Sequence, residues 1–353
     1  MSSHQHSLPL ARWTQETGSH RAGELLREGR AHEGGGCVAE AMQCYMAAID
    51  AAEHIADREI LAESLRRLGI AHHQRNEQTL ARELCDRSQM IAIEGGDAVL
   101  AAEALNALAG FDFESGSIEP AREKFHRALA LGDGNAGLRG RIEQNLGILA
   151  NVQGGLTEAT AHYQQSLLAF ESAGEERGCA IAYHNLGMVS ADRDLWDDAD
   201  RYFRLSFEIA ERIGDIHLQG LGLLNHSEVH IARQRYDQAR QNAETALGIF
   251  DQLGSKLDKA DAYKVIGLVY RETGRYPLAE SRLRTAMELA VGTGSILAEA
   301  EVSRELALLY EVMGRKQEAL ELLNAASGLF ARLNARIDLG DVSSRITQLR
   351  ESR

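Results

Sequence analysis

The stretch YHNLGMVSADRDLWDDADRYFRLSFEIAERIGD at residues 183–215 decides the fold, because it contains every element of a unit that recurs along the chain. An apolar residue and a small residue, Leu186 and Gly187, open the pattern, and Ala199 follows twelve residues after the glycine. The period is 40 residues, apart from one repeat of 38. The small position is occupied in turn by Gly29, Gly69, Ala109, Gly147, Gly187, Ser227, Gly267 and Ala307. The alanine position is occupied by Ala41, Ala81, Ala121, Ala159, Ala199, Ala239, Ala279 and Ala319. Such a spacing predicts a repeat architecture.

Each repeat is expected to fold as a helix A, a tight turn and a helix B. Small side chains at the two recurring positions let the paired helices cross closely, because a larger group would push their axes apart. Seven residues after the small position the chain has Gly36, Asn76, Gly116, Gly154, Asp194, Gln234, Gly274 and Gly314. Most of these residues suit the left-handed backbone that ends a helix. One repeat cannot bury its apolar stripe alone, so neighbouring repeats must stack.

The period divides the chain into eight repeats and two end segments. The repeats are predicted at 22–61, 62–101, 102–139, 140–179, 180–219, 220–259, 260–299 and 300–339. Residues 1–21 have no clear place in the array, and we expect them to be flexible. Residues 340–353 are expected to form a capping helix, because Val342, Ile346 and Leu349 follow one apolar stripe.

Composition narrows the class of partner. The formal net charge is −14, so the chain would repel a nucleic acid at long range and also an anionic membrane surface.

No pair of the four cysteines has the C-x-x-C spacing, which favours reduced thiols in a cytoplasmic protein over a zinc or redox site. The first residues lack the apolar core of a secretory signal, and no apolar run approaches the roughly 18 residues of a membrane span. We expect a cytoplasmic protein with no cofactor.

The recurring residues resemble the tetratricopeptide repeat (TPR) family. The Leu-Gly pair, the later aromatic residue, the glycine turn and the paired alanines match its consensus. The segment Tyr183–Gly187, with Ala210 and Gly214-Asp215 downstream, looks most like the 40-residue variety of LGN/Pins-type scaffold proteins and kinesin light chains. The resemblance covers residues 22 to about 340. It implies an all-α, right-handed superhelix of about eight repeats that serves as a scaffold or adaptor, often in signalling, and holds a protein or peptide in a concave groove lined by the A helices.

By the same resemblance, A-helix residues around the small position face the groove. Asn145, Asn185 and Asn225 stand two residues before the small residue in three successive repeats. Each amide offers a donor and an acceptor, as an extended peptide backbone requires. Alternatively, asparagine is merely the common residue at this consensus position. The other expected groove residues are Arg66, Arg67, His73, Asn106, Arg141, Gln144, Asn151, His184, Glu228, Lys264, Arg271 and Arg304.

Three arginines bear on the charge of the partner. Arg66, Arg67 and Arg141 would make the first half of the groove basic, which favours an acidic partner or a terminal carboxylate. The alternative is a solvated face whose charges have partners one helical turn away. The Lys/Asn arrangement with which chaperone-binding family members hold a terminal carboxylate is not reproduced, since Lys264 is followed four residues later by Leu268.

Two rival functions stand beside the scaffold. In a regulatory sensor, a small peptide or metabolite in the groove would change the pitch of the superhelix. An enzyme is not expected, because no catalytic pattern stands out. His226 and His230 lie one turn apart but at core positions, which favours packing over metal binding. Cys85 stands where other repeats have an aromatic residue, which favours an inert core thiol.

Overall fold

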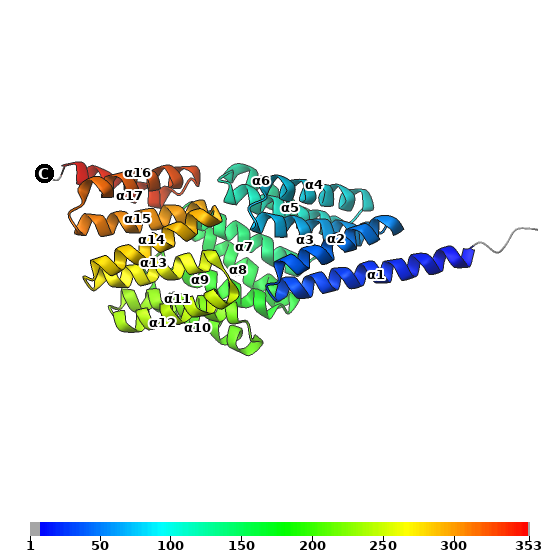
Figure 1. The fold of residues 1–353 in the computed structure, drawn as a ribbon, viewed down its shortest axis with the longest axis horizontal. Coiled ribbons are helices and arrows are strands. Elements are labelled where there is room, and N and C mark those ends of the chain that lie inside the picture. The colour runs from blue at the N-terminus through cyan, green and yellow to red at the C-terminus, as the bar shows by residue number, and fades with distance from the viewer. Residues whose placement is uncertain (1–7, 352–353) are drawn as a thin grey trace, which may run out of the picture. The chain divides into compact units, whose positions relative to one another are not determined.

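The computed structural model describes residues 8–351, and over this range the chain has seventeen α-helices and no strand (Figure 1). The A helices are α1 (Leu8–Gly34), α3 (Arg58–Gln74), α5 (Ala98–Glu114), α7 (Ala136–Val152), α9 (Glu176–Ala191), α11 (Ile216–Ala232), α13 (Lys256–Glu272) and α15 (Ile296–Val312). The B helices are α2 (Val38–Ile55), α4 (Gln78–Gly95), α6 (Ile118–Leu131), α8 (Leu156–Ala173), α10 (Trp196–Ile213), α12 (Tyr236–Leu253), α14 (Tyr276–Thr293) and α16 (Lys316–Arg332). Helix α17 (Arg336–Glu351) follows the eighth pair. The predicted all-α repeat fold is confirmed.

The A helices begin earlier than the predicted repeat boundaries. Helix α3 starts at Arg58, four residues before the boundary at 62, and α17 starts at Arg336 instead of residue 340. The small and alanine positions give the period, whereas capping side chains set the helix ends. Asp57 and Asp215 each accept a hydrogen bond from the backbone N–H three residues on, at 3.1 and 3.0 Å.

The first helix begins inside the N-terminal segment that was expected to be flexible. Helix α1 begins at Leu8, so residues 8–21 of the segment expected to be flexible are helical, and residues 1–7 lie outside the described residues. The flexibility of this segment stays a prediction.

The turns between helices A and B have the predicted backbone. All eight turn residues have positive φ, including the non-glycine residues Asn76 (64°), Asp194 (58°) and Gln234 (57°). Asparagine and aspartate tolerate this region because their side chains can bond locally. Gln234 has no such advantage, so repeat packing holds it there against its own preference.

The small position lets helices A and B approach closely. A Cβ atom on Gly147 would lie 2.5 Å from the Tyr163 ring, and one on Gly267 would lie 2.6 Å from Cγ of Leu283. Each of these B-helix partners stands four residues past an anchor alanine, and all eight anchor alanines are at most 1% exposed. The close crossing predicted from the sequence is present, with the aromatic or aliphatic side chain of helix B filling the space above the glycine.

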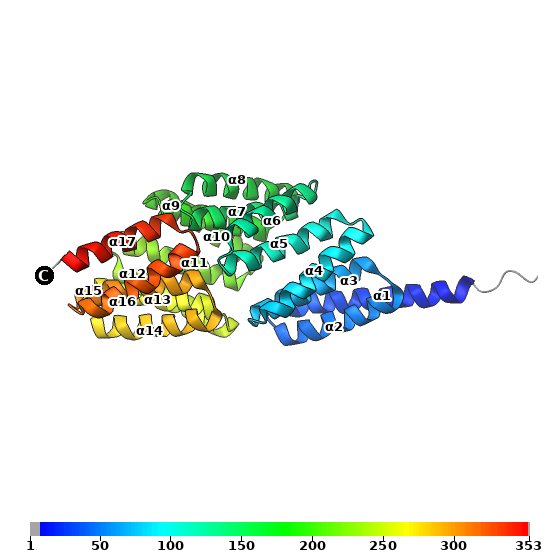
Figure 2. The same cartoon turned by 90° about the horizontal axis from the view of Figure 1, so that it is seen from above.

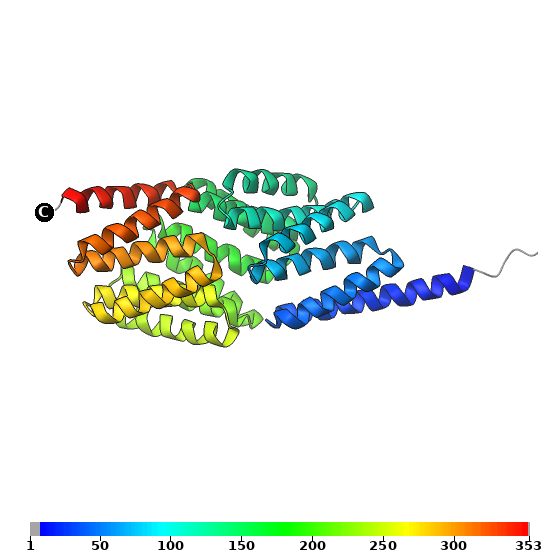
Figure 3. The ribbon, with the colours of Figure 1, turned by 45° about the horizontal axis from the view of Figure 1, so that its top comes forward.

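The chain divides into two compact units, each containing stacked helix pairs (Figures 2 and 3). The first unit comprises Met1–Phe111 and Glu123–Asn135, and the second comprises Asp112–Arg122 and Ala136–Arg353. In the second unit every helix from α7 to α17 packs on the next one in sequence. Helix α17 buries Val342, Ile346 and Leu349, the stripe predicted for a cap. Among residues 8–351, no helix combines the length and the apolar character needed to cross a bilayer.

Candidate functional site: the inner face of the second unit

The A helices form the inner layer of the second unit. Successive A helices from α7 to α15 contact one another directly, in addition to their B-helix partners. No comparable contact joins successive B helices in the described part of this unit. Because the A helices lie closer to one another than the B helices do, the stack curves with the A helices on its concave side. Side chains of the A helices that point away from the B layer therefore line a concave surface.

Two asparagines of the predicted row are buried in this layer. Asn185 is 8% exposed and Asn225 is 5% exposed, whereas Asn145 is half-buried. The Asn225 amide donates to Nδ1 of His184 at 2.6 Å, which joins α11 to α9. The Asn185 side-chain nitrogen is buried and has no hydrogen-bond partner. A buried amide without a partner is costly, so Asn185 offers two N–H groups to any acceptor that enters.

Histidines and an aspartate extend this polar layer toward α13. Burial lowers the pKa of His184 to about 4, so its ring is neutral at pH 7 and can accept from Asn225. His217 on α11 binds Asp258 on α13 with 2.8 Å between Nε2 and Oδ2, and this hydrogen bond raises the pKa of His217. The two imidazoles therefore have opposite tendencies, one held neutral and one favouring its charged form.

A group of five carboxylates, the carboxylate cluster, lies on the concave side around two cations. Its members are Asp192, Glu228, Asp261, Glu301 and Asp338, from the end of α9 and from α11, α13, α15 and α17. Lys264 forms ion pairs with Glu301 and, at 3.1 Å, with Asp261. Arg304 forms an ion pair with Asp338. When all five carboxylates are ionised, they exceed the two cations by three negative charges.

Three carboxylates of the carboxylate cluster, Asp192, Glu228 and Asp261, have raised pKa values, and burial is the largest cause in each case. Burial raises the pKa of Glu228 to about 7; the charge of Lys264 acts to lower this pKa, and the charges of Glu301, Asp192 and Asp261 act to raise it. Loss of water around Asp192 raises its pKa too, although the residue as a whole is exposed. Glu301 differs: burial acts to raise its pKa, but Lys264 and Arg304 outweigh burial and hold the pKa below its usual value. Opposite charge from a ligand would stabilise the ionised forms of Glu228 and Asp192.

The remaining predicted groove residues of the second unit are held by neighbours. Asn151 donates to Asp192 at 2.8 Å, which ties the end of α7 to the end of α9. Arg271 donates to Glu305 at 2.6 Å, and this pair satisfies both charges within the protein. Arg141 lies 3.6 Å from Glu175, and Gln144 is half-buried on α7. Asn151 therefore belongs with the carboxylate cluster, whereas Arg141 and Arg271 already have carboxylate partners.

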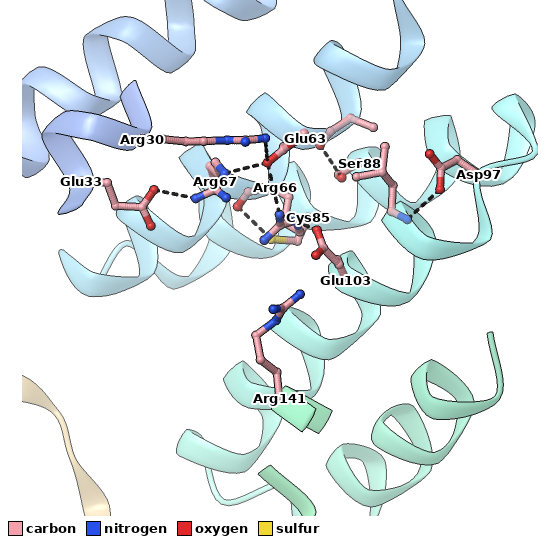
Figure 4. A network of polar contacts seen from close by, with 12 residues as sticks. Arg30, Glu33, Glu63, Arg66, Arg67, Cys85, Ser88, Asp97, Glu103 and Arg141 are labelled. Carbon is pink, nitrogen blue, oxygen red and sulfur yellow. Dashed lines mark hydrogen bonds and ion pairs between the residues drawn. The ribbon is translucent and has the colours of Figure 1, made fainter. Parts of the chain in front are cut away.

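In the first unit the predicted arginines belong to a ladder of ion pairs (Figure 4). Arg66 binds Glu103 at 2.6 Å, and Arg67 binds both Glu63 and Glu33 at 2.9 Å. Arg30 pairs with Glu63. The ladder contains three arginines and three glutamates, so its charges balance. Two further predicted residues of this unit are half-buried: His73, which stacks on Phe111 with 4.0 Å between the ring centroids, and Asn106.

Sequence reasoning missed four members of the carboxylate cluster: Asp192, Asp261, Glu301 and Asp338. A usable signal was present at an offset of 37 residues. Arg66 pairs with Glu103 and Lys264 pairs with Glu301, in both cases a cation three residues before the small position and a glutamate six residues before the next small position. Opposite charges at this offset mark A-helix pairs that satisfy each other.

His226 and Cys85, which the sequence pattern assigned to packing, contact other side chains or are buried in the structure. His226 lies edge-on to Phe207, with 6.3 Å between the ring centroids, and its Nε2 is 3.8 Å from Asp200. Cys85 is fully buried, and burial raises the pKa of its thiol to about 12. Among residues 8–351, no group of three or more His, Cys, Asp or Glu side chains is placed to hold a metal ion.

Comparisons with known proteins agree with this architecture. Residues 138–215 and 219–290 match the model of the tetratricopeptide repeat family. The structure of a Rap protein complexed with Competence and Sporulation Factor is similar, with a TM-score of 0.63 and 12% identity over 96% of this chain and 98% of that chain. Aspartyl phosphate phosphatase F from Bacillus subtilis has a TM-score of 0.50 and 12% identity over 100% of this chain and 96% of that chain. No curated protein matches the sequence significantly.

A third similar structure is a signal transduction ATPase with numerous domains and a tetratricopeptide repeat sensor, from Pyrococcus horikoshii. Its TM-score is 0.52, with 17% identity over 84% of this chain and 45% of that chain. At these identities the similarity concerns the fold alone.

The fold and the recurring residues define a solenoid of paired helices. The match over residues 138–215 and 219–290, together with this fold, supports a tetratricopeptide repeat protein, a class of scaffold that mediates protein interactions. Its membership of the LGN/Pins or kinesin-light-chain variety stays a prediction.

Proposed function

We propose that the concave face of the second unit binds an extended peptide segment of a partner protein, with a positively charged group of that segment at the carboxylate cluster. The observation that carries this proposal is the excess of carboxylates over cations around Glu228, whose pKa is raised to about 7. A lysine or arginine side chain, or a terminal amine, would supply the missing charge through charge-assisted hydrogen bonds. The proposal is one of binding without catalysis.

The asparagine row supports a peptide as the ligand. Asn185 holds a buried, unpartnered amide nitrogen on α9, and Asp192 is the C-cap residue of the same helix with helical backbone angles. Residues seven positions apart lie on nearly the same face of an α-helix, so Asn185 and Asp192 point to the same side of α9. A peptide carbonyl at Asn185 and a cationic group at Asp192 would then belong to one ligand. One structure of similar fold was solved as a complex with Competence and Sporulation Factor, which accords with a ligand-binding role.

The partner segment proposed here is positively charged, whereas the sequence favoured an acidic partner. An acidic partner was expected because of Arg66, Arg67 and Arg141, and nothing in the structure tests that partner directly. Each of these arginines already has a carboxylate partner of its own chain. A new anion would have to compete with those glutamates, whereas a cation at the carboxylate cluster would meet unbalanced charge. We therefore propose a basic segment.

Fluorescence anisotropy with designed peptides tests the proposal. The probe is a hexapeptide of alanine and glycine with one internal arginine, its terminal amine blocked by the fluorescent label, and its control replaces arginine by uncharged citrulline of nearly the same shape. Hydrogen bonds to charged groups contribute about 1.5–3 kcal/mol, so the arginine peptide should bind the full chain about tenfold or more tightly than the citrulline peptide. Equal affinities of the two peptides would refute the charge assignment.

Variants then locate the site. Replacing Asn145, Asn185 and Asn225 together by alanine should abolish capture of the arginine peptide while leaving helicity close to that of the parent. Glu228→Gln should lower the preference for arginine over citrulline. Glu288→Gln, on the exposed side of α14, is the matched control for loss of one negative charge and should leave the preference unchanged. Unaltered binding by the triple variant would show that the peptide does not bind in the groove.

A further inference from the structure

The second unit contains a contact that repeat stacking does not require. The turn between α7 and α8 meets the start of α17, which lies beyond the eighth repeat (Figures 2 and 3). Gly154 in this turn has φ of +80°, and a Cβ atom there would lie 2.6 Å from Cγ1 and 3.5 Å from Cβ of Ile337. Solenoid repeats normally contact only their neighbours. This closing contact between Gly154 and Ile337 therefore constrains the curvature of the second unit without being needed to build it.

The closing contact is small and loosely packed. It involves turn residues, and a cavity of about 520 Å³ lined by Gly154, Gly155, Asn334 and Ile337 among others opens beside it. Ile337 keeps 55% of its surface exposed. Because little apolar area is buried there, the contact can open at a small free-energy cost compared with unstacking a repeat.

Both sides of the closing contact are tied to the carboxylate cluster. On one side, the backbone N–H of Gly154 donates to the carbonyl of Asn151 at 2.8 Å, and the Asn151 side chain donates to Asp192 at 2.8 Å. On the other side, Ile337 is followed directly by Asp338, whose carboxylate pairs with Arg304. Asp338 and Glu301 lie close enough to Asp192 for their charges to act on it. The charges of Asp338 and Glu301 act to raise the pKa of Asp192, and Arg304 and Asn151 act to lower it, so the electrostatics of the two sides of the closing contact are linked.

We propose that the closing contact between Gly154 and Ile337 is coupled to the groove, so that a cationic group held between Asp192 and Asp338 draws the contact shut and a shut contact raises affinity for that group. This inference rests on the proposed function and adds its regulation. By thermodynamic linkage the coupling works in both directions, so anything that fixes the contact closed must strengthen binding by the same factor. A partner that grips α17 could open the groove and release the peptide.

An engineered disulfide tests the coupling. Replacing Gly154 and Ile337 by cysteine places two Cβ atoms 3.5 Å apart, within the range that a disulfide spans. Cys37, Cys44 and Cys179 are replaced by serine, and the buried Cys85 is kept. The measurements are the affinity of the arginine hexapeptide for the oxidised and reduced forms of the same full-length variant, and the rate of disulfide formation with and without that peptide. Ile337→Ser, in the otherwise native chain, serves as the variant that opens the contact.

Coupling predicts that the oxidised form binds the arginine peptide about fivefold or more tightly than the reduced form, and that the peptide accelerates disulfide formation. Ile337→Ser should weaken binding while circular dichroism remains that of the native chain. Equal affinities of the oxidised and reduced forms, or a folded variant in which the disulfide does not form, would overturn the coupling. If the native chain itself fails to distinguish arginine from citrulline, the proposed function fails. Native binding with no effect of the disulfide would overturn the coupling alone.

Discussion

Glu228 offers a test of the electrostatics that is independent of any ligand. Its pKa of about 7 in the folded protein lies above the ordinary 4.5. Between these values the folded chain holds a proton that the unfolded chain has released, so stability falls as pH rises from 4.5 through 7. Below pH 4.5 the group contributes nothing, and above pH 7 the full penalty of the charged carboxylate remains.

The variant Glu228→Gln removes this penalty while keeping the shape of the side chain. At about 1.4 kcal/mol for each pKa unit, the rise corresponds to roughly 3 kcal/mol as an upper bound. Water reaches the partly exposed side chain and screens its charge, so we expect the variant to be more stable than the parent by about 1–2 kcal/mol at pH 8. At pH 4.5 the two proteins should have nearly equal stability.

Urea unfolding followed by circular dichroism at pH 4.5 and pH 8 measures the difference. The control Glu288→Gln, an exposed glutamate on α14, should change the free energy of unfolding by less than about 0.5 kcal/mol at both pH values. A Glu228→Gln protein that is less stable than the parent at pH 8 would show that Lys264 fully satisfies this carboxylate. The case for a vacant cationic position would then fail.

Two further predictions concern the fold and the buried thiol. Gly147→Ala should destabilise the second unit by about 1–3 kcal/mol, because the added methyl group meets the Tyr163 ring, whereas Gly248→Ala on the open face of α12 should stabilise it by up to about 1 kcal/mol in the same urea assay. Equal effects of the two substitutions would contradict the packing account. Cys85 should resist alkylation by iodoacetamide in the native chain at pH 8 while the exposed Cys37 reacts, as mass spectrometry of the digested protein would show. Comparable labelling of both thiols would contradict its burial.

Local chemistry made the fold predictable from the sequence. The residue with positive φ in each of the eight turns could be predicted from the sequence. Each one lies seven residues after the small residue at which helices A and B cross. The predicted repeat boundaries lie four residues after the starts of the A helices from α3 to α15, because the period carries no information on where a helix begins. That information resided in capping residues such as Asp57 and Asp215, which the repeat pattern does not single out.

The site was less predictable, for a geometrical reason. The prediction of Asn185 and Glu228 as groove residues uses only their positions within one repeat. The rest of the carboxylate cluster depends on how far the stack curves, since Asp192 and Glu301 belong to repeats separated by two others. Arginine partners were missed for a similar reason: Glu103 reaches Arg66 from the next repeat, and reading one helix at a time does not reveal it.

The most direct test of the central claim is a selection of random hexapeptides displayed on phage, using the full chain as bait and sequencing the enriched peptides. The account predicts enrichment of arginine or lysine at one position, reduced when Glu228→Gln is the bait. Enrichment of aspartate or glutamate instead would contradict the account and return the binding surface to the arginines of the first unit.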